Sequence, residues 1–479
     1  IQMDDKEKIV PIILTGGSGS RLWPLSRKTY AKQYIKLFDN QTLFQKTVLR
    51  YSGKSYHPPV IVTNDISRFI IKYQLNECSI NNSDIIIEPF SKNTAAAALL
   101  GILHAKKILE NPFVLISPSD HLIKNEELLN DLIFKAKKDL PLNKILLFGI
   151  KPNNPNTGYG WIDTNLRKEN KKAAYLEIKN FIEKPKLNLA KKLFESKSSF
   201  WNSGIFFGRA QAFIHEFCNI TPKLFQIVKD SYVNSYNDLE FVRIRSGEWQ
   251  DLDDISIDKA IIEKTKNKNV IPFKGLWSDV GSWDSLMKQY PSDNKNNVSF
   301  GNVSQFDSEN SLFFSSSNKI HLLGIGLKDI ITVATEDAVL VLKKEKNQDV
   351  KKSIEKLRDK KIEQADSFLN DYRPWGNFEI ISKGKNFLVK KIFVNPNSRL
   401  SLQSHKFRSE HWVVVKGKAK VTLDNETFYL SENESTYVNT GVVHRLENDK
   451  NDELIIIEVQ TGSYLGEDDI LRFEDDYKR

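Results

Sequence analysis

The 479-residue chain contains two cysteines, Cys78 and Cys218, and has no long run of apolar residues. Two thiols are too few for a disulfide framework or a thiolate zinc site, so a reducing, cytoplasmic compartment is the simplest expectation. The longest apolar run, 95–103, contains a glycine and is far shorter than the roughly 20 residues of a membrane helix. The first residues also lack the basic-then-apolar order of a secretion signal. No membrane partner is therefore expected.

The basic residues form no arm or stripe, although the net charge is +9. Nucleic-acid binding concentrates positive charge on one face, so no nucleic-acid partner is expected and small anionic substrates fit better. Arginine is scarce, with 15 residues against 55 lysines. An arginine within a motif is therefore a candidate for bidentate recognition of phosphate or carboxylate.

Short apolar runs alternate with segments of helical periodicity over the first 150 residues. Strands are expected at 9–14, 60–63, 85–88, 113–116 and 145–150, and helices are expected to begin at Thr42, Ile66, Asn93 and Glu126. This alternation predicts an α/β fold with a parallel, doubly wound sheet. Ligands of such a sheet lie at the carboxyl ends of its strands.

The pattern changes after a polar, turn-rich stretch at 291–298. Short β-like pieces follow at 319–323 and 330–333, and a charged helical segment spans about 347–368. Beyond it, short β-rich runs separated by turns are typical of an all-β domain. We therefore expect three parts: an α/β domain at 1–290, a β-rich connector with a linker helix at 291–368, and a β domain at 369–479.

A glycine-rich turn follows the first expected strand, with Gly16, Gly17, Ser18 and Gly19 preceding Arg21. Glycines at the end of a strand let backbone N–H groups approach a phosphate closely. The turn lacks the ending of a P-loop, and it also lacks the third glycine of the dinucleotide fingerprint. Alone it is compatible with a phosphate cradle or with a tight structural turn.

The longer stretch Gly-Gly-Ser-Gly-Ser-Arg-Leu-Trp-Pro-Leu-Ser at 16–26, followed by Lys32-Gln33, resembles the signature of sugar nucleotidyltransferases, in the form of the mannose-1-phosphate guanylyltransferases. Ala31 replaces the proline that the family usually has before Lys-Gln. Further family motifs occur in order: Glu88-Pro89, Lys92-Asn93-Thr94, Ser117 to His121, Gly158-Tyr159-Gly160, Phe181 to Pro185, Trp201 to Gly204, Ser256 to Asp258, and Trp277 to Trp283. The resemblance implies a Rossmann-like nucleotidyltransferase domain that uses GTP, mannose 1-phosphate and Mg²⁺.

Transfer of a nucleotidyl group to a sugar phosphate brings two anions together, so the site must neutralise charge. Asp120 and Asp279 follow separate apolar runs and are candidates for two carboxylate ligands of Mg²⁺, the role these positions have in the family. The resemblance further implies that Arg21 and Lys32 hold the triphosphate and that Lys184 meets the phosphate of the sugar. Taken singly, Asp120 is better explained as a helix cap and Lys184 as a solvated lysine, but the ordered set of motifs reverses that preference. The remaining substrate-binding candidates are Gly16, Gly17, Ser18, Gly19, Glu88, Asn93, Thr94, Gly160, Glu183 and Asn202.

A second set of candidate residues lies in the β-rich end of the chain. Gln403 and His405 are two residues apart, so on a strand they face the same way. With Glu410 and His444 they make a plausible ligand set for a divalent metal. His411 alternates with Glu410 along the strand and is as well explained as a half-buried histidine, so it is left out of the set.

The spacing of these ligands and of Gly417 and Gly441 resembles a cupin β-barrel, and the surrounding motifs resemble type II phosphomannose isomerases. The resemblance implies interconversion of mannose 6-phosphate and fructose 6-phosphate with Zn²⁺, Co²⁺ or Mn²⁺. Arg408, Arg445 and Arg472 are candidates for holding the sugar phosphate or the enediol intermediate.

As a whole the chain resembles the bifunctional mannose-1-phosphate guanylyltransferase/mannose-6-phosphate isomerase family. Two alternatives remain open: a guanylyltransferase whose cupin has no isomerase turnover, and a sugar-nucleotide-binding regulator on an inactive transferase fold. The residues also leave the oligomeric state open, with a homodimer as one option.

Overall fold

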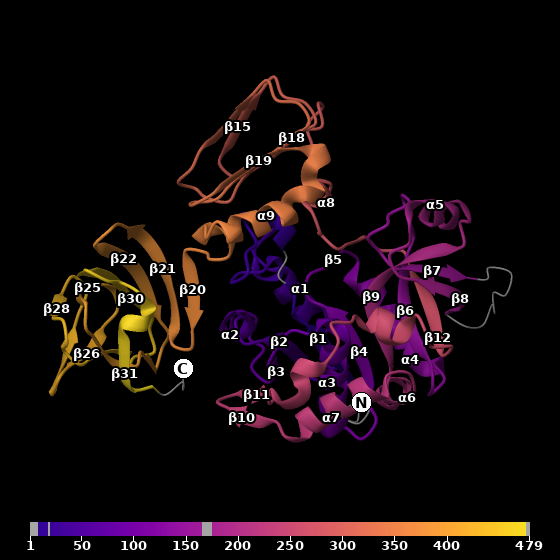
Figure 1. Cartoon of the computed structure of the whole chain (residues 1–479), viewed down its shortest axis with the longest axis horizontal. Coiled ribbons are helices and arrows are strands. Elements are labelled where there is room, and N and C mark those ends of the chain that lie inside the picture. Colours follow the sequence, from indigo (N-terminus) through magenta and orange to yellow (C-terminus); the bar gives the residue numbers. More distant parts are fainter. Residues whose placement is uncertain (1–7, 18–19, 165–174, 476–479) are drawn as a thin grey trace. The chain divides into compact units, whose positions relative to one another are not determined.

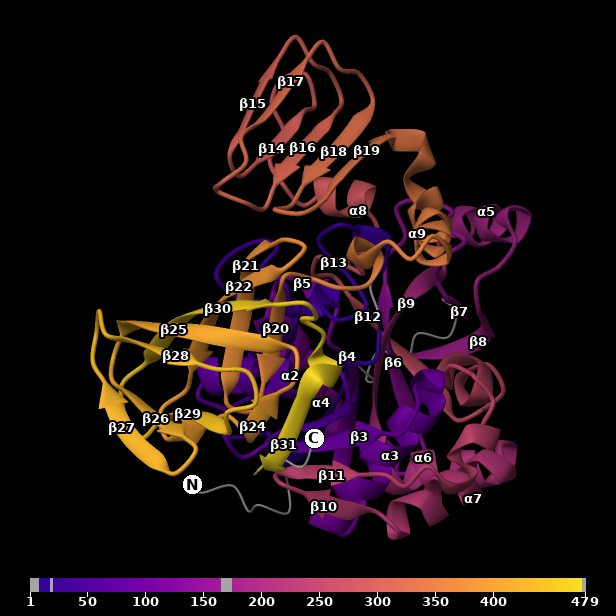
Figure 2. The same ribbon diagram turned by 60° about the vertical axis from the view of Figure 1, so that its left-hand side comes forward.

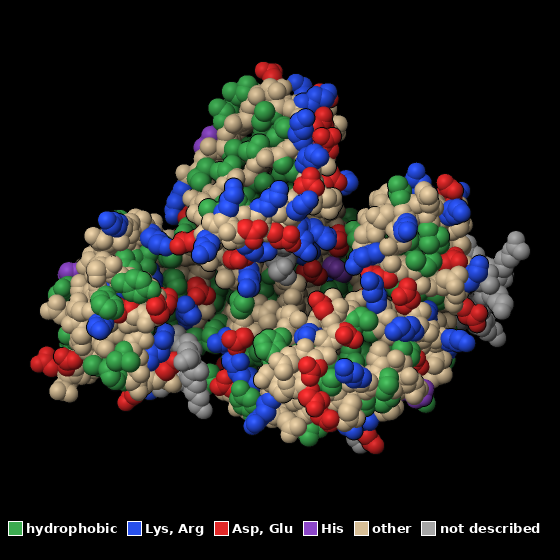
Figure 3. Space-filling model, in the orientation of Figure 1, with side chains coloured by type: hydrophobic (Ala, Val, Ile, Leu, Met, Phe, Trp, Pro, Cys, Tyr) green, Lys and Arg blue, Asp and Glu red, His purple; other side chains and the backbone are tan. Residues whose placement is uncertain are grey.

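The computed structural model describes residues 8–17, 20–164 and 175–475, and the chain divides into two compact units (Figure 1). The first unit contains the residues up to 366 apart from 69–73, and the second contains 367–479 together with 69–73. No helix of the described residues is long and apolar enough to cross a membrane. On the face drawn in Figure 3, positive and negative side chains are interspersed over both units.

The first unit is built on an eleven-stranded sheet with the strand order β10-β11-β3-β2-β1-β4-β9-β6-β12-β8-β7. The strands are β1 (Ile9–Leu14), β2 (Val60–Asn64), β3 (Asp84–Glu88), β4 (Phe113–Pro118), β6 (Ile145–Ile150), β7 (Trp161–Thr164), β8 (Leu176–Ile182), β9 (Ser199–Arg209), β10 (Tyr236–Asp238), β11 (Phe241–Arg243) and β12 (Lys268–Phe273). All five strands expected before residue 150 are present, and β1, β2, β3 and β4 are parallel neighbours.

The parallel arrangement predicted for the strands before residue 150 is confirmed, and β9, which lies beyond that segment, runs antiparallel between β4 and β6. The chain between β6 and β9 is not a single crossover helix. It forms the antiparallel pair β7–β8 and then α5 (Leu187–Glu195). This connection does not bring the chain back parallel to β4 and β6, as a single crossover helix would. The alternating pattern that favoured parallel pairing ended at residue 150.

Helices cover the sheet, and α3 (Asn93–Ile108) packs most closely against it. Its first turns carry Ala95 to Ala98, all buried, and their small side chains allow the helix axis to approach the strands. The helices α6 (Ala210–Ile220) and α7 (Pro222–Val233) pack against α3. The other helices of this part of the chain are α1 (Leu43–Arg50), α2 (Arg68–Glu77) and α4 (Glu126–Asp139).

A small β-helix follows α8 (Trp283–Met287) (Figure 2). One wall has the parallel strands β14 (Val298–Phe300), β16 (Leu312–Ser315) and β18 (Ile330–Ala334), with β19 (Val339–Lys343) antiparallel to β18. The other wall pairs β15 (Val303–Phe306) with β17 (Leu322–Ile325). The linker helix α9 (Val350–Asp359) completes this region, and it is shorter than the expected segment.

The loop after the glycine turn anchors the β-helix and the linker to the sheet. Arg27, which is 1 % exposed, donates two hydrogen bonds of 2.6 Å to the carboxylate of Asp337 after β18. Trp23 Nε1 donates to the carbonyl of Gln364 after α9, at 2.8 Å. The Trp283 indole in turn donates to the Trp23 carbonyl at 3.0 Å. The loop after the glycine turn therefore connects the sheet with the β-helix and the linker inside the first unit.

The second unit is a β-barrel of two sheets, which confirms the expected cupin-type fold. One sheet has the order β20-β21-β22-β30-β25-β28, and the other has the order β27-β26-β29-β24-β31 with β23 paired to β29. Buried side chains such as Val414, Val421, Leu446 and Ile456 fill the space between them. The strands are β20 (Asn370–Arg373), β21 (Gly376–Lys383), β22 (Phe387–Val394), β23 (Ser398–Arg399), β24 (Leu402–His405), β25 (Arg408–Lys416), β26 (Ala419–Leu423), β27 (Glu426–Leu430), β28 (Ser435–Val438), β29 (His444–Asn448), β30 (Leu454–Gly462) and β31 (Ile470–Glu474).

The close packing of α3 leads to a stability prediction. Glycine within a helix usually costs about 1 kcal/mol relative to alanine, but a Cβ at position 101 would lie 2.3 Å from Ile12 Cγ2. We therefore expect Gly101→Ala to destabilise the protein, by about 1–3 kcal/mol from overpacking, measured as a lower midpoint of urea unfolding. In a double-mutant cycle, Ile12→Ala should cost less in the Gly101→Ala protein than in the wild type. A stabilised Gly101→Ala protein would contradict the packing argument.

Candidate active sites

A cavity of about 430 Å³ opens at the carboxyl ends of β1, β3 and β4. This is the edge of the sheet at which ligands were expected. Six of the predicted site residues line the cavity: Gly16, Gly17, Glu88, Asn93, Thr94 and Asp120. Ser18 and Gly19, which the sequence also predicts here, lie outside the described residues.

The side chain of Gln33 holds the main chain of the glycine turn, and the backbone at Gly16 and Gly17 faces open space. Gln33 Nε2 donates to the carbonyls of Thr15 and Gly17, at 3.0 and 3.2 Å. A Cβ added at Gly16 or Gly17 would meet no atom within 4 Å, so the backbone there faces open space that a ligand can fill. Gln33 was recognised only as part of the motif, and the structure shows that its side chain fixes the turn.

A buried lysine joins the two carboxylate residues expected to bind Mg²⁺. Lys32 Nζ lies 3.1 Å from Asp120 Oδ2 and also donates to the main-chain carbonyls of Asp279 and Val280. The antiparallel pair β5 (Leu122–Ile123) and β13 (Trp277–Ser278) sets this geometry, because Ser278 lies opposite Leu122. Burial would raise the pKa of Asp120, but Lys32 lowers it below its ordinary value.

Tyr159 orients the second carboxylate. Its hydroxyl donates to Asp279 Oδ1 at 2.8 Å, and its ring contacts those of Trp201 and Trp277 edge-on. Burial and then the Asp279 charge raise the pKa of Tyr159, whereas Arg21 acts in the opposite direction. Arg21 therefore lies within electrostatic range of the same group, with an exposed side chain. Tyr159 was not predicted as a site residue, although it stands inside the Gly-Tyr-Gly motif.

A second cluster of predicted residues lies around Gly160. Asn202 N donates to the Gly160 carbonyl at 2.8 Å, and a Cβ at 160 would lie 2.7 Å from Glu183 Oε2. Lys184 Nζ pairs with Glu183 Oε1 at 3.2 Å, but its side chain is 63 % exposed. Lys184 also has a positive φ of 47°, which costs a non-glycine residue on the order of 1 kcal/mol. The structure therefore keeps this lysine at the surface in a strained backbone position.

Two buried carboxyl groups on the cavity wall have raised pKa values. Burial raises the pKa of Glu88 to about 8, and Glu88 Oε1 has no hydrogen-bond partner among the described residues. Burial, and then Glu183, raise the pKa of Asp258 to about 7. Asp258 accepts a hydrogen bond of 2.7 Å from Asn202 Nδ2, which connects the cavity to the cluster around Gly160. The predicted site did not include Asp258, although its Ser-Ile-Asp motif was recognised.

The raised pKa of Glu88 predicts a specific pH dependence. Because Glu88 holds its proton in the folded state, its stabilising contribution is complete below its ordinary pKa of 4.5 and is lost as the pH rises through about 8. The thermal midpoint of the wild type should therefore fall more between pH 5 and 8.5 than that of Glu88→Gln, measured by calorimetry. Glu127→Gln, an exposed glutamate of α4, is the control and should follow the wild type. Equal pH slopes for Glu88→Gln and the wild type would contradict the assignment.

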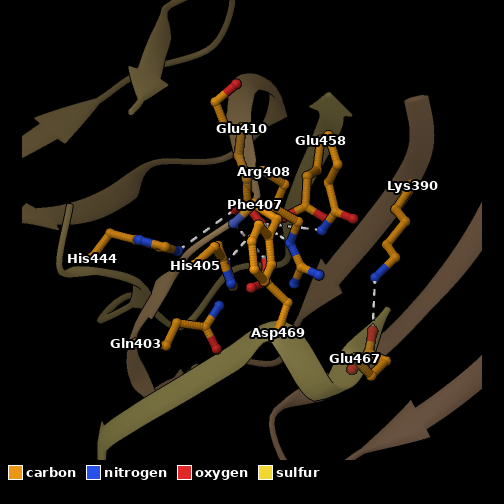
Figure 4. Close-up of polar contacts among 12 residues, drawn as sticks. Lys390, Gln403, His405, Phe407, Arg408, Glu410, His444, Glu458, Glu467 and Asp469 are labelled. Atoms are coloured by element: carbon orange, nitrogen blue, oxygen red, sulfur yellow. Dashed lines mark hydrogen bonds and ion pairs between the residues drawn. The ribbon is translucent and has the colours of Figure 1, made fainter. Parts of the chain in front are cut away.

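In the barrel, three of the four predicted metal ligands converge (Figure 4). The ligand atoms of His405, Glu410 and His444 lie within 4.8 Å of one another, and each residue is at most 3 % exposed. His405 Nε2 is 3.0 Å from Glu410 Oε1, and His444 Nε2 is 3.6 Å from Glu410 Oε2. The register that places Gln403 opposite His444 brings β24 and β29 together here.

The hydrogen bonds around this cluster favour a metal. His444 Nδ1 is bonded to the Val442 carbonyl at 2.9 Å, which leaves Nε2 with its lone pair toward Glu410. Neither His405 ring nitrogen nor His444 Nε2 has a normal hydrogen-bond partner among the described residues. Burial would raise the pKa of Glu410, but His405, His444 and Arg408 hold it far below its ordinary value. Two imidazole rings, with three nitrogens that lack a normal hydrogen-bond partner, and one ionised carboxylate fit a divalent cation.

The fourth predicted ligand and the predicted arginines are placed differently. Gln403 lies beside His405 (Figure 4), and its Oε1 accepts a hydrogen bond of 2.9 Å from Ser401. Arg408 and Arg472 line the same pocket as Gln403 and Glu410, and Arg408 Nε is 3.4 Å from Glu410 Oε1. Arg445 is not among the pocket-lining residues and pairs with Glu474 at 2.8 Å. His411 is exposed and packs against Tyr437.

Three family models match successive parts of the chain. They are Nucleotidyl transferase at residues 10–296, MannoseP isomerase/GMP-like beta-helix domain at 301–357, and Mannose-6-phosphate isomerase C-terminal at 360–475. With the cavity at the sheet edge and the ligand cluster in the barrel, these matches define the class: a nucleotidyltransferase joined through a β-helix to a cupin of the isomerase type.

Relatives match along nearly the whole chain. A mannose-1-phosphate guanylyltransferase of Salmonella montevideo is 40 % identical over 474 residues, which cover 98 % of this chain and 100 % of that protein. The alginate biosynthesis protein AlgA of Pseudomonas aeruginosa is 38 % identical over 471 residues, covering 98 % and 97 %. A crystal structure described as a mannose-1-phosphate geranyltransferase from Thermus thermophilus shares the fold, with 24 % identity and a TM-score of 0.63 over 73 % of this chain and 99 % of that one. The chain belongs to the family of mannose-1-phosphate guanylyltransferases that carry a C-terminal mannose-6-phosphate isomerase domain, as its motifs indicated.

Proposed function

We propose that this protein transfers GMP from GTP to mannose 1-phosphate, giving GDP-mannose and pyrophosphate, and that its barrel interconverts mannose 6-phosphate and fructose 6-phosphate. The observation that carries the first activity is the junction of Asp120, Lys32 and Asp279 beside the cavity. The observation that carries the second is the buried cluster of His405, Glu410 and His444. The names of the relatives support the transferase activity.

The proposed division of labour follows the expected domains. Residues 1–290 would carry the transferase, 291–368 the β-helix and linker, and 369–479 the isomerase. The middle part packs on the first through Arg27 and Trp283, so we assign it a supporting role rather than a catalytic one.

In the transferase, an ionised phosphate oxygen of mannose 1-phosphate attacks the α-phosphorus of GTP, and pyrophosphate leaves. The nucleophile is already anionic, so no protein base is required, and the site must neutralise charge instead. Asp120 and Asp279 are the residues that would hold Mg²⁺, because Lys32 joins the two residues, the charges of both act on His121, and the described residues leave Asp279 Oδ2 without a hydrogen bond. When bound, the ion would offset the negative charge of the phosphates.

The other predicted residues have roles that their positions support. The open backbone at Gly16 and Gly17 would donate to phosphate oxygens, with Arg21 and Lys184 as mobile cations at the rim. Lys32 is already engaged with Asp120, so we propose that it positions the carboxylates and takes up phosphate when substrate enters. Glu183 and Asn202 would accept and donate hydrogen bonds to sugar hydroxyls. Glu88, with one free oxygen in the cavity, would accept from the N–H groups of guanine, with Asn93 and Thr94 beside it.

The assignment of Asp279 predicts separable activities. Asp279→Asn removes one carboxylate from the charge-neutralising site, so pyrophosphate release should fall roughly a thousandfold while isomerisation is retained. Pyrophosphate release and fructose 6-phosphate formation are measured on the same preparation. Asp284→Asn, which changes the half-buried partner of Lys288 in α8, is the matched control and should keep both activities. Wild-type transfer by Asp279→Asn would show that the metal assignment is wrong.

In the barrel, His405, Glu410 and His444 would hold a divalent cation, with Gln403 as a fourth ligand if its amide turns from Ser401. When bound, the cation would stabilise the oxyanion that forms as a proton leaves the carbon next to the carbonyl. Arg408 lies against Glu410 in the same pocket and would stabilise the enediol intermediate. Trp412 Nε1 and Gln460 Nε2 donate to the two oxygens of Glu410, at 3.1 Å each, and so fix the carboxylate for this task.

The converse substitution tests the barrel. His444→Ala should abolish isomerisation and weaken binding of Zn²⁺ or Mn²⁺ by about ten- to a hundredfold or more, while pyrophosphate release persists. His411→Ala is the matched control, because this histidine is exposed on the same barrel, and it should bind metal normally. Metal binding by equilibrium dialysis and both enzyme assays give the readout. Unchanged metal binding in His444→Ala would remove the histidine from the ligand set.

A further inference from the structure

The pocket of the barrel is narrow in the observed conformation. Its volume is about 50 Å³, against about 430 Å³ for the cavity of the first unit. One wall belongs to the C-terminal segment, which contributes Glu467, Ile470 and Arg472. A sugar phosphate that binds here therefore competes with the side chains of this wall for space.

Two cations lie together at the end of the pocket away from the metal ligands. Lys390 of β22 is 6 % exposed, and its Nζ lies 4.6 Å from the centroid of the Phe378 ring. Arg373 at the end of β20 places its guanidinium carbon 5.7 Å from the same centroid. Two like charges beside one ring repel each other unless an anion lies between or near them. A buried lysine also needs a partner to offset the cost of its desolvation.

Glu467 supplies that negative charge to Lys390, whereas Arg373 also pairs with Asp371 Oδ2, at 2.8 Å. Its Oε1 pairs with Lys390 Nζ at 3.1 Å, and its Oε2 lies 3.9 Å from Arg373 Nη2. Glu467 is the one carboxylate that pairs with Lys390 in the part of the chain that the structure describes. Its own side chain is 53 % exposed, so water can reach the pair from outside. Burial would raise the pKa of Glu467, but the two cations lower it, so it is ionised at neutral pH.

Hydrogen bonds attach the turn that carries Glu467 to the barrel, and β31, which follows the turn directly, pairs with β24. Asp469 accepts hydrogen bonds from the main-chain N–H groups of Lys406 and Phe407, at 3.0 and 3.2 Å. Arg408 Nη1 donates to the Gly466 carbonyl at 2.9 Å. These bonds hold the turn across the pocket, and Figure 4 shows Lys390 and Glu467 on the side opposite His444, with Arg408 between.

We propose that Lys390 and Arg373 form the phosphate-binding subsite of the barrel, and that Glu467 occupies this subsite until the phosphate of the sugar displaces it. The inference rests on the proposed isomerase function and adds to it the residues that recognise the phosphate. A phosphate dianion carries more charge than one carboxylate and can accept from both cations at once, so it competes well for them. With the phosphate at this end, the carbonyl carbon of the open-chain sugar is directed toward His405, Glu410 and His444.

The test uses the full-length protein loaded with Mn²⁺ and measures both binding by calorimetry and steady-state kinetics. The probes are mannose 6-phosphate, inorganic phosphate and unphosphorylated mannose. Lys390→Met keeps the length of the side chain but removes its charge, and Lys391→Met is its matched control, because Lys391 lies on the other face of β22 over Phe393. Glu467→Gln removes the competing charge, and Asp468→Asn in the same turn is its control, since Asp468 contacts Tyr464 instead.

The proposal predicts opposite effects for the two substitutions. Lys390→Met should raise both Kd and KM for mannose 6-phosphate by about tenfold or more, with a far smaller change in kcat. The same substitution should raise the Kd for inorganic phosphate by a similar factor. Glu467→Gln should lower Kd and KM for mannose 6-phosphate, because Lys390 is no longer held by a carboxylate, while Arg373 keeps its contact with Asp371. Neither change should alter the response to unphosphorylated mannose, and both control variants should match the wild type.

The outcomes separate this inference from the isomerase proposal. If Lys390→Met and Lys391→Met bind mannose 6-phosphate equally, or if Glu467→Gln weakens binding, the subsite is overturned even where isomerisation continues. If the wild type shows no isomerisation but binds mannose 6-phosphate with the predicted dependence on Lys390 and Glu467, the subsite stands and the turnover proposal fails. A lowered thermal midpoint identifies a variant with a folding defect. The double variant Lys390→Met/Glu467→Gln removes both charges of the pair, so it leaves no buried charge without a partner.

Discussion

One buried ammonium group organises the proposed transferase site. Lys32 belongs to the loop after the first strand, Asp120 follows β4, and Asp279 follows β13, so its three contacts join segments about 90 and 160 residues apart in sequence. Burial alone would raise the pKa of Asp120, and the Lys32 ammonium lowers it instead. The lysine therefore keeps Asp120 ionised and ties it to the main chain at Asp279, and the glycine turn, held by the adjacent Gln33, is positioned by the same loop.

Much of this site could be predicted from the sequence because its residues stand in contiguous motifs at the ends of apolar runs. Asp120, Gly16 and Glu88 were found in this way, and all three line the cavity. Tyr159, Asp258 and the direction of β9 could not be predicted, because each depends on a contact between distant segments. The tyrosine matters through its bond to Asp279, and the aspartic acid matters because the fold buries it beside Glu183. Arg445 was a reasonable candidate by type, but its side chain pairs with Glu474 at the end of β31.

The two units handle charge in different ways. In the first, the lining of the cavity includes open glycine backbone and three acidic residues, Glu88, Asp120 and Asp258, and burial is the main cause of the raised pKa values of Glu88 and Asp258. In the barrel, nearly every charged group in the pocket is already paired, as Glu410 is with the histidines and Lys390 is with Glu467. The first arrangement suits substrates that bring their own charge and metal. The second arrangement suits a pocket in which the phosphate of the substrate replaces the Glu467 carboxylate beside Lys390.

The contacts of Arg27 and Trp23 have a consequence for any attempt to shorten this protein. The loop that presents Lys32 is fixed at one end by the β-helix and at the other by the residues after the linker helix. A fragment that stopped at residue 290 would leave the Arg27 guanidinium, almost fully buried in the intact chain, without its carboxylate, a loss of about 3–5 kcal/mol for a buried pair. The smallest independent transferase therefore extends to about residue 366, and the β-helix acts as a brace for the loop that assembles the active centre.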